Sequence, residues 1–131
     1  MVELWDPEMP VPKVAGEKAS MRAQELIKEM KNFASMQSQL IRDIVDSIPS
    51  TIKIYFYGSR ARGDYKKTSD YDFLVIVPDN IFGSDFLDVQ LELDRIGQRY
   101  KNFDVQASHH DSLLTREAEN DGKLIYASQP G

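Results

Sequence analysis

The stretch that decides the fold of this chain is GSRARG at residues 58–63, followed by SDYD at residues 69–72. Residues 52–57 (IKIYFY) directly precede it and alternate β-branched and aromatic side chains, which predicts a strand. Residues 70–77 predict a second strand. The glycine-rich stretch therefore predicts a short helical turn and a polar loop between two strands.

The second strand begins with two carboxylates, Asp70 and Asp72. Residues two apart on a strand point to the same face, so these side chains should repel each other unless a cation lies between them. Asp104 is a third candidate, because it lies within an apolar strand (residues 102–107), where an unpaired carboxylate is costly. Three aspartates of this kind suit two Mg²⁺ ions about 3.5–4 Å apart, an arrangement used in nucleotidyl transfer.

The turn at residues 58–63 carries groups that suit phosphate. Gly58 allows the backbone to approach closely, and Ser59 offers a hydroxyl and backbone N–H groups at the start of a helical turn. Arg60 and Arg62 do not share one helical face, so we expect one of them, Arg62, to point at phosphate. Lys66, on the following loop, could reach the leaving group. The predicted nucleotide-binding residues are therefore Gly58, Ser59, Arg62 and Lys66.

This pattern resembles the DNA polymerase β-type nucleotidyltransferase superfamily. It consists of Gly58-Ser59, ten residues, Asp70-x-Asp72 and a later strand aspartate, Asp104. The sequence GSRARG is similar to that of the minimal nucleotidyltransferase branch, and the likeness spans about residues 36–126. It implies an α+β fold with a small mixed sheet flanked by helices, ATP or another nucleoside triphosphate as donor, and Mg²⁺ held by the three aspartates. It further implies that Asp104 helps to deprotonate the acceptor hydroxyl.

The same resemblance implies a partner. Minimal nucleotidyltransferases of this branch are often antitoxins that attach AMP to a tyrosine of a HEPN ribonuclease toxin. Residues 1–35, an arm and helix, exceed what such a domain needs and could build a homo-oligomer or contact a partner, which leaves residues 36–131 as the nucleotidyltransferase domain. We expect no additional acceptor-binding domain after Tyr126. Two alternatives stay open: an antitoxin that binds without catalysis, and an enzyme that modifies a small molecule such as an aminoglycoside.

Composition agrees with one small globular domain of 131 residues. A net charge of −5 argues against stable nucleic-acid binding. We expect a local basic group around the glycine turn that suits a small polyphosphate, made of Lys53, Arg60, Arg62, Lys66 and Lys67. The absence of cysteine fits the cytoplasm, and neither a secretory signal nor a membrane span is visible.

The remaining elements follow from apolar spacing. Residues 17–48 predict one long helix, or two that break near residues 34–35. A helix capped by Ser84 should bury Phe86, Val89, Leu93, Ile96 and Tyr100. The final elements should be a helix over residues 112–120 and a packed segment at residues 124–126. Tyr55 and Tyr57 could be core residues, and we expect His109 and His110 to be solvated.

Overall fold

The computed structural model describes residues 17–129, and side chains from residue 21 onward. In this part of the chain, four strands form one mixed sheet in the order β3-β2-β1-β4. The strands are β1 (Lys53–Tyr57), β2 (Tyr71–Ile76), β3 (Phe103–Ser108) and β4 (Lys123–Ala127). Strand β1 is antiparallel to both β2 and β4, whereas β2 and β3 are parallel. The predicted small mixed sheet is thus confirmed.

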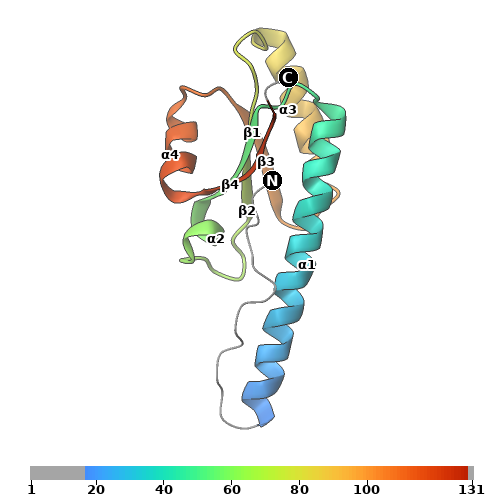
Figure 1. Ribbon diagram of the computed structural model, residues 1–131, viewed down its shortest axis with the longest axis vertical. Helices are drawn as coiled ribbons and strands as arrows, with labels where there is room; N and C mark the ends of the chain where they lie inside the picture. The colour runs from blue at the N-terminus through green and yellow to red at the C-terminus, as the bar shows by residue number, and fades with distance from the viewer. Residues whose placement is uncertain (1–16, 130–131) are drawn as a thin grey trace.

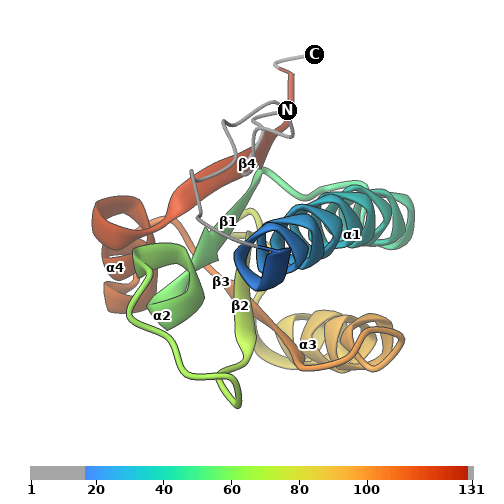
Figure 2. The same ribbon diagram turned by 90° about the horizontal axis from the view of Figure 1, so that it is seen from below.

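Helices cover both faces of the sheet (Figures 1 and 2). The long α1 (Glu17–Ser47) and α3 (Gly83–Gly97) lie side by side on one face. The short α2 (Gly58–Arg62) and α4 (Leu113–Asp121) lie on the other. The chain is therefore a three-layer arrangement, in which two different helix pairs enclose one sheet.

Helix α1 is continuous, so of the two predicted possibilities a single long helix is the one observed. Its 31 residues give a length of about 46 Å at 1.5 Å per residue. Its first turns project beyond the sheet (Figure 1). The predicted division at residue 35 falls inside this helix and stays a prediction, and the arm at residues 1–16 lies outside the described residues. None of the helices within residues 17–129 is long and apolar enough to cross a membrane.

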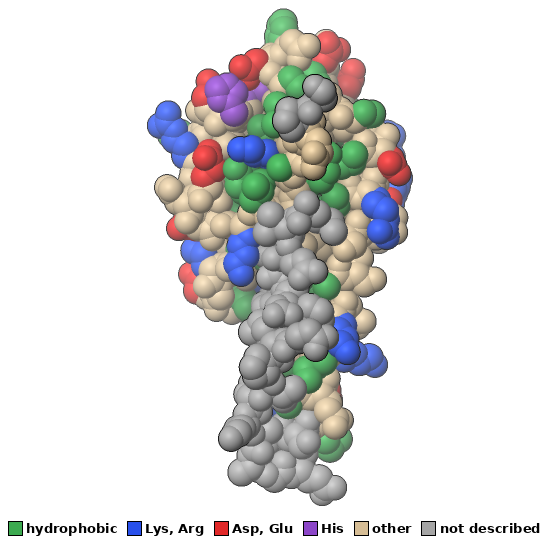
Figure 3. All heavy atoms as spheres, in the orientation of Figure 1, with side chains coloured by type: hydrophobic (Ala, Val, Ile, Leu, Met, Phe, Trp, Pro, Cys, Tyr) green, Lys and Arg blue, Asp and Glu red, His purple; other side chains and the backbone are tan. Residues whose placement is uncertain are grey.

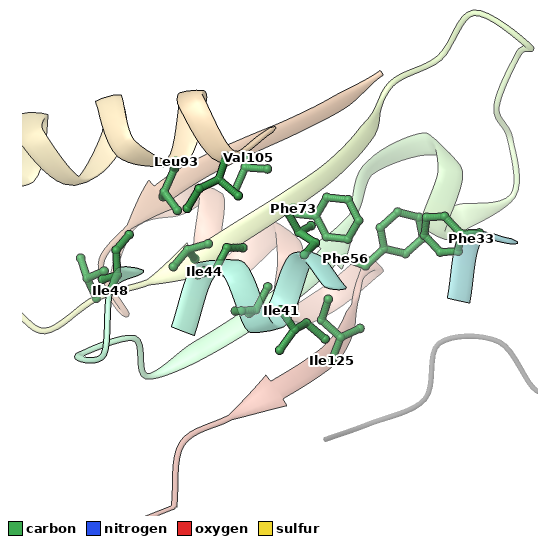
Figure 4. Packing of buried hydrophobic residues seen from close by; sticks show 14 residues of the cluster. Phe33, Ile41, Ile44, Ile48, Phe56, Phe73, Leu93, Val105 and Ile125 are labelled. Atoms are coloured by element: carbon green, nitrogen blue, oxygen red, sulfur yellow. The ribbon is translucent and has the colours of Figure 1, made fainter. Parts of the chain in front are cut away.

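The main core lies between the sheet and the pair α1 and α3 (Figure 4). Alternation along the strands sends Phe56 and Phe73 into this core, where the Phe33 ring of α1 lies 5.3 Å from that of Phe56. A smaller core on the opposite face buries Tyr55 and Tyr57, which confirms their predicted core position. Complete burial of each such side chain stabilises the fold by roughly 1.5–3 kcal/mol.

Three predicted details were wrong. Ser84 does not cap α3, because Gly83 has a φ of 59° and already begins the helix, so that Phe82 occupies the N-cap position. Tyr100 lies beyond the last residue of α3, although it packs against the core. Residues 124–126 do not merely pack against the end of the sheet but form most of β4, which pairs with β1.

Candidate active site

Two of the three predicted aspartates lie side by side. In the parallel pairing of β2 with β3, Asp72 is the direct partner of Asp104. Alternation along β2 turns Asp72 to the sheet face that carries α2 and α4, the same face as Leu74 and Ile76. Strand pairing therefore brings together two carboxylates that are far apart in the sequence.

Asp70 lies immediately before β2 and is exposed. Burial, together with the negative charges of Asp104 and Asp70, raises the pKa of Asp72 to about 6, against the opposing effect of Arg62. The negative charges of Asp70 and Asp104 therefore both act on Asp72. A divalent cation would relieve this repulsion, since carboxylate oxygens are the ligands that Mg²⁺ prefers.

The oxygens of the three aspartates do not all converge to within 4.8 Å of one another. Among the described residues, the group of ligand atoms that does so is Asp79, His110 and Asp111. This group lies past the last residues of β2 and β3, at the opposite end of these strands from Asp72 and Asp104, and all three residues are exposed. Figure 3 shows histidine beside acidic side chains near one end of the molecule. The sheet thus brings Asp72 and Asp104 together, while Asp70 belongs to the adjoining loop.

Gly58 is held against Asp72. It is buried, has a φ of 80°, and begins α2 directly after β1. A Cβ atom on Gly58 would collide with the Oδ2 atom of Asp72. A glycine is required here both for its backbone conformation and for this close approach. Ser59 follows in the first turn of α2, whose N-terminus receives no hydrogen bond from the side chain of its N-cap residue, Tyr57.

The two arginines of α2 point to different surroundings, as their spacing predicts. Arg62 is exposed, pairs with Asp64 at 3.3 Å, and lowers the pKa of Asp72, so its charge acts on the candidate site. Arg60 instead donates to backbone carbonyls of the loop, to Ser69 O at 3.2 Å and Lys67 O at 3.1 Å.

The predicted basic group is smaller than expected. Lys66 and Lys67 are exposed on the loop after α2. Lys53, however, begins β1, and that strand reaches Gly58 only at its other end. At about 3.3 Å per residue, this places Lys53 more than 10 Å from the turn, in a hollow that Glu119 and His110 also line. Including Lys53 in the group was therefore wrong.

Sequence reasoning missed Tyr57 and Glu117 as members of this site. Burial and the nearby charges of Asp72, Asp104 and Glu117 together raise the pKa of the Tyr57 phenol to about 12. Glu117 also raises the pKa of Asp72. Glu117 lies in α4, and the next residue, Ala118, packs in the same small core as Tyr57. The position of Glu117 near the site is therefore evident only once α4 is packed on the sheet.

The two adjacent histidines, His109 and His110, differ in burial and in their contacts. His110 is exposed, and its Nε2 atom lies 3.2 Å from Oδ2 of Asp79. His109 is half-buried, with its Nε2 atom 2.7 Å from the carbonyl oxygen of Ile81 and its ring packed on Phe86. The prediction of a solvated pair was therefore wrong for His109, because its ring faces the segment that leads into α3.

The fold is that of a nucleotidyltransferase domain. A family model described as polymerase beta, nucleotidyltransferase, matches residues 39–130. The chain therefore belongs to the polymerase β nucleotidyltransferase family, and the predicted fold and enzyme class are confirmed.

Several solved structures are similar. A candidate nucleotidyltransferase from Sulfolobus solfataricus is 26% identical, with a TM-score of 0.56 over 71% of this chain and 78% of that chain. A variant of the toxin–antitoxin complex MntA–HpeT is 20% identical, with a TM-score of 0.52 over 70% of this chain and 73% of that chain. A toxin–antitoxin complex with AMP-PNP is 22% identical, with a TM-score of 0.50 over 70% of this chain and 73% of that chain. At these lower identities the likeness concerns the fold alone. Among proteins of curated function, none matches this chain.

Proposed function

We propose that this protein is a Mg²⁺-dependent nucleotidyltransferase that transfers AMP from ATP to a hydroxyl group, with a tyrosine of a HEPN toxin as the acceptor. The observation that carries the proposal is the pairing of Asp72 with Asp104 beside Gly58. Two Mg²⁺ ions held by Asp70, Asp72 and Asp104 would neutralise phosphate charge and favour ionisation of the attacking hydroxyl.

The roles of the protein side chains follow from their positions. Ser59 and the backbone N–H groups at the start of α2 would bind the triphosphate, with Gly58 allowing its close approach. Arg62 and Lys66 would balance the charge of the departing pyrophosphate. The acceptor oxygen attacks the α-phosphorus, the bond to pyrophosphate breaks, and Asp104 takes the proton of the hydroxyl.

The partner is proposed from two supports. Two solved structures of similar fold are toxin–antitoxin complexes, one of them with AMP-PNP. In addition, α3 and the residue before it expose large apolar side chains of the kind that partner proteins cover, with exposed fractions of 68% for Phe82, 64% for Leu87 and 61% for Leu91. On the face shown in Figure 3, acidic and basic side chains are interspersed, which suits a protein partner better than a nucleic-acid backbone.

The experiment is a transfer assay. The protein is incubated with Mg²⁺, each α-labelled nucleoside triphosphate in turn, and a HEPN toxin. We expect label from ATP on the toxin, lost in Asp70→Ala and Asp72→Ala, and lost when the toxin's acceptor tyrosine is replaced by phenylalanine. Retained transfer in either aspartate variant would remove the proposed mechanism.

A second candidate function is an antitoxin that neutralises its partner by contact alone, which the exposed side chains of α3 favour. Asp104→Asn separates the two candidates, because this change removes a carboxylate and leaves α3 intact. Loss of neutralisation supports catalysis, whereas full neutralisation supports binding. A homo-oligomer through α1, a small-molecule acceptor and a cytoplasmic location stay predictions.

A further inference from the structure

The side chain of Arg60, in α2, contacts the loop that leads into Asp70. We propose that Arg60 is a positioning residue, which fixes this loop and thereby the place of the Asp70 carboxylate. The proposal rests on the function proposed above, because it concerns the same site. It separates the two arginines of α2: Arg60 holds the protein backbone, and Arg62 faces the candidate substrate side.

The guanidinium group of Arg60 binds two carbonyls directly before Asp70. Its Nε atom donates to Ser69 O at 3.2 Å, and its Nη2 atom donates to Lys67 O at 3.1 Å. These acceptors are two residues apart on the loop, and a planar group with several fixed donors reaches both at once. A lysine has a single ammonium group, so it cannot reproduce this geometry.

Two aromatic rings contact the same guanidinium. Its central carbon lies 4.2 Å from the ring centroid of Tyr65 and 4.5 Å from that of Tyr71. The Tyr71 ring stacks in turn on Phe33 of α1, with centroids 4.8 Å apart. Ser69 and Tyr71, the residues on either side of Asp70, both contact Arg60. Arg60 therefore links the backbone before Asp70 to Tyr71, which packs against the main core.

Two other contacts hold the ends of this segment: Arg62 pairs with Asp64 at 3.3 Å, and the N–H of Tyr71 donates to Asn102 O at 2.7 Å. Between them, the remaining hydrogen bonds of the loop, among the described residues, are internal. The N–H of Lys66 donates to Ser69 Oγ at 3.0 Å, and the N–H of Ser69 donates to Lys66 O at 2.9 Å. These bonds close a turn within the loop but do not attach it to the body of the protein. Asp70 itself is exposed and carries the same charge as the nearby Asp72. Without Arg60, repulsion would favour loop positions in which the two carboxylates are further apart.

Amide hydrogen exchange tests this directly and requires no catalysis. The variants are Arg60→Lys and Arg60→Gln, with Arg62→Lys as the matched control from the same helix. We expect the Ser69 amide to exchange about tenfold faster in both Arg60 variants, because one charge-assisted attachment of the loop is lost. Core amides of β1 should keep their wild-type rates, which shows that the fold is intact. Arg62→Lys should leave the Ser69 rate unchanged.

A second measurement asks whether the loop matters for the site. Binding of Mn²⁺ in the presence of AMP-PNP is followed by electron paramagnetic resonance. We expect the dissociation constant for Mn²⁺ to rise about tenfold in Arg60→Lys and less in Arg62→Lys. Wild-type exchange of Ser69 in both Arg60 variants, or equal effects of the Arg60 and Arg62 substitutions, would overturn the inference. A wild-type protein that binds no Mn²⁺ would instead contradict the proposed function, while the exchange rates still decide whether Arg60 fixes the loop.

Discussion

Asp72 and Asp104 are direct partners in the parallel pairing of β2 with β3, with their carboxylates on the same face of the sheet. Like charges opposite each other on neighbouring strands destabilise a sheet. Here burial and the charge of Asp104 raise the pKa of Asp72 to about 6. The folded protein therefore keeps a costly pair of carboxylates where a cation would remove the cost.

Replacing Asp72 by asparagine should stabilise the metal-free protein in a pH-dependent way. The folded-state pKa of Asp72 lies above the value of about 3.9 for an unfolded aspartate, so ionisation of Asp72 costs stability as the pH rises through 6. We expect Asp72→Asn to be more stable by about 1–2 kcal/mol at pH 8 and no more stable below pH ~4. Urea unfolding over this range measures the difference.

Magnesium provides the control for the same variant. Added Mg²⁺ with AMP-PNP should raise the free energy of unfolding of the wild type and not that of Asp72→Asn. An equal Mg²⁺ effect on both proteins would show that Asp72 does not hold the ion.

Gly58→Ala should damage the site more than the fold. Its Cβ would displace the Asp72 carboxylate, and alanine must also adopt the φ of 80°. Gly63→Ala is the matched control, because Gly63 has a φ of 94° but, its two chain neighbours aside, no other described residue has an atom within 4 Å of the position that a methyl group would take there. We expect Gly63→Ala to lose about 1–2 kcal/mol from the backbone alone, and Gly58→Ala to lose more. Only Gly58→Ala should also abolish transfer of AMP, and retained transfer would show that the close approach to Asp72 is dispensable.

Local patterns in the sequence predicted the elements of this fold well. Residues 52–57 alternate, and the structure places Ile54 and Phe56 in one core and Tyr55 and Tyr57 in the other. Such alternation needs no knowledge of the rest of the chain, because neighbouring side chains of any strand point to opposite faces. The motif at residues 58–72 is likewise local, so the spacing of its residues can be read without knowledge of the rest of the chain.

The long-range relationships were harder to predict. The sequence suggested Asp104 only through its apolar neighbours, whereas its place beside Asp72 depends on the register between β2 and β3. Glu117 gave no signal, because the rotation of α4 on the sheet decides which of its acidic residues faces the site. The role of Arg60 was also hidden, since it depends on how residues 64–69 fold back over α2. Tertiary packing determines the positions of Asp104, Glu117 and Arg60 relative to the site.

Asp43 anchors α1 to the turn between α3 and β3, and this contact should be sensitive to acid. Tyr100 donates to Oδ2 of Asp43 at 2.6 Å, and Arg99 lies 3.5 Å from the same atom. Burial alone would raise the pKa of Asp43, but the hydrogen bonds from Tyr100 and Gln39 and the charge of Arg99 outweigh burial and lower it. The ionised form is therefore favoured by folding, and its contribution is lost as the pH falls below about 4.

We expect Tyr100→Phe to destabilise the protein by about 1–2 kcal/mol at pH 7, and by less at pH 3. Thermal unfolding at both values measures this change. A loss that is independent of pH would show that Tyr100 contributes packing and not its bond to the carboxylate.

Gln37 is a site where substitution should stabilise the protein. Its side chain is 5% exposed on the core face of α1, and its Oε1 atom has no hydrogen-bond partner among the described residues. A buried carbonyl without a partner costs about 1–3 kcal/mol, whereas leucine has a similar size and no polar atom. We expect Gln37→Leu to raise the free energy of unfolding by about 1 kcal/mol in urea titrations. Gln24→Leu, on an exposed position of the same helix, is the control, and a loss of stability in Gln37→Leu would mean that the amide is satisfied in solution.

Gln90 of α3 closes the outer edge of the sheet. Strand β3 ends the strand order, and Gln90 pairs with its free backbone groups: its Nε2 atom donates to Val105 O at 3.0 Å, and its Oε1 atom accepts from Ala107 N at 2.7 Å. One amide side chain thereby takes the place of a neighbouring strand, on an edge that could otherwise pair with another chain. Gln90→Ala should lower the free energy of unfolding by about 1–3 kcal/mol and increase the rate of aggregation, measured by light scattering. Gln98→Ala, just past the end of the same helix, should change neither, and unchanged aggregation of Gln90→Ala would show that the edge is protected by its strand length or charge instead.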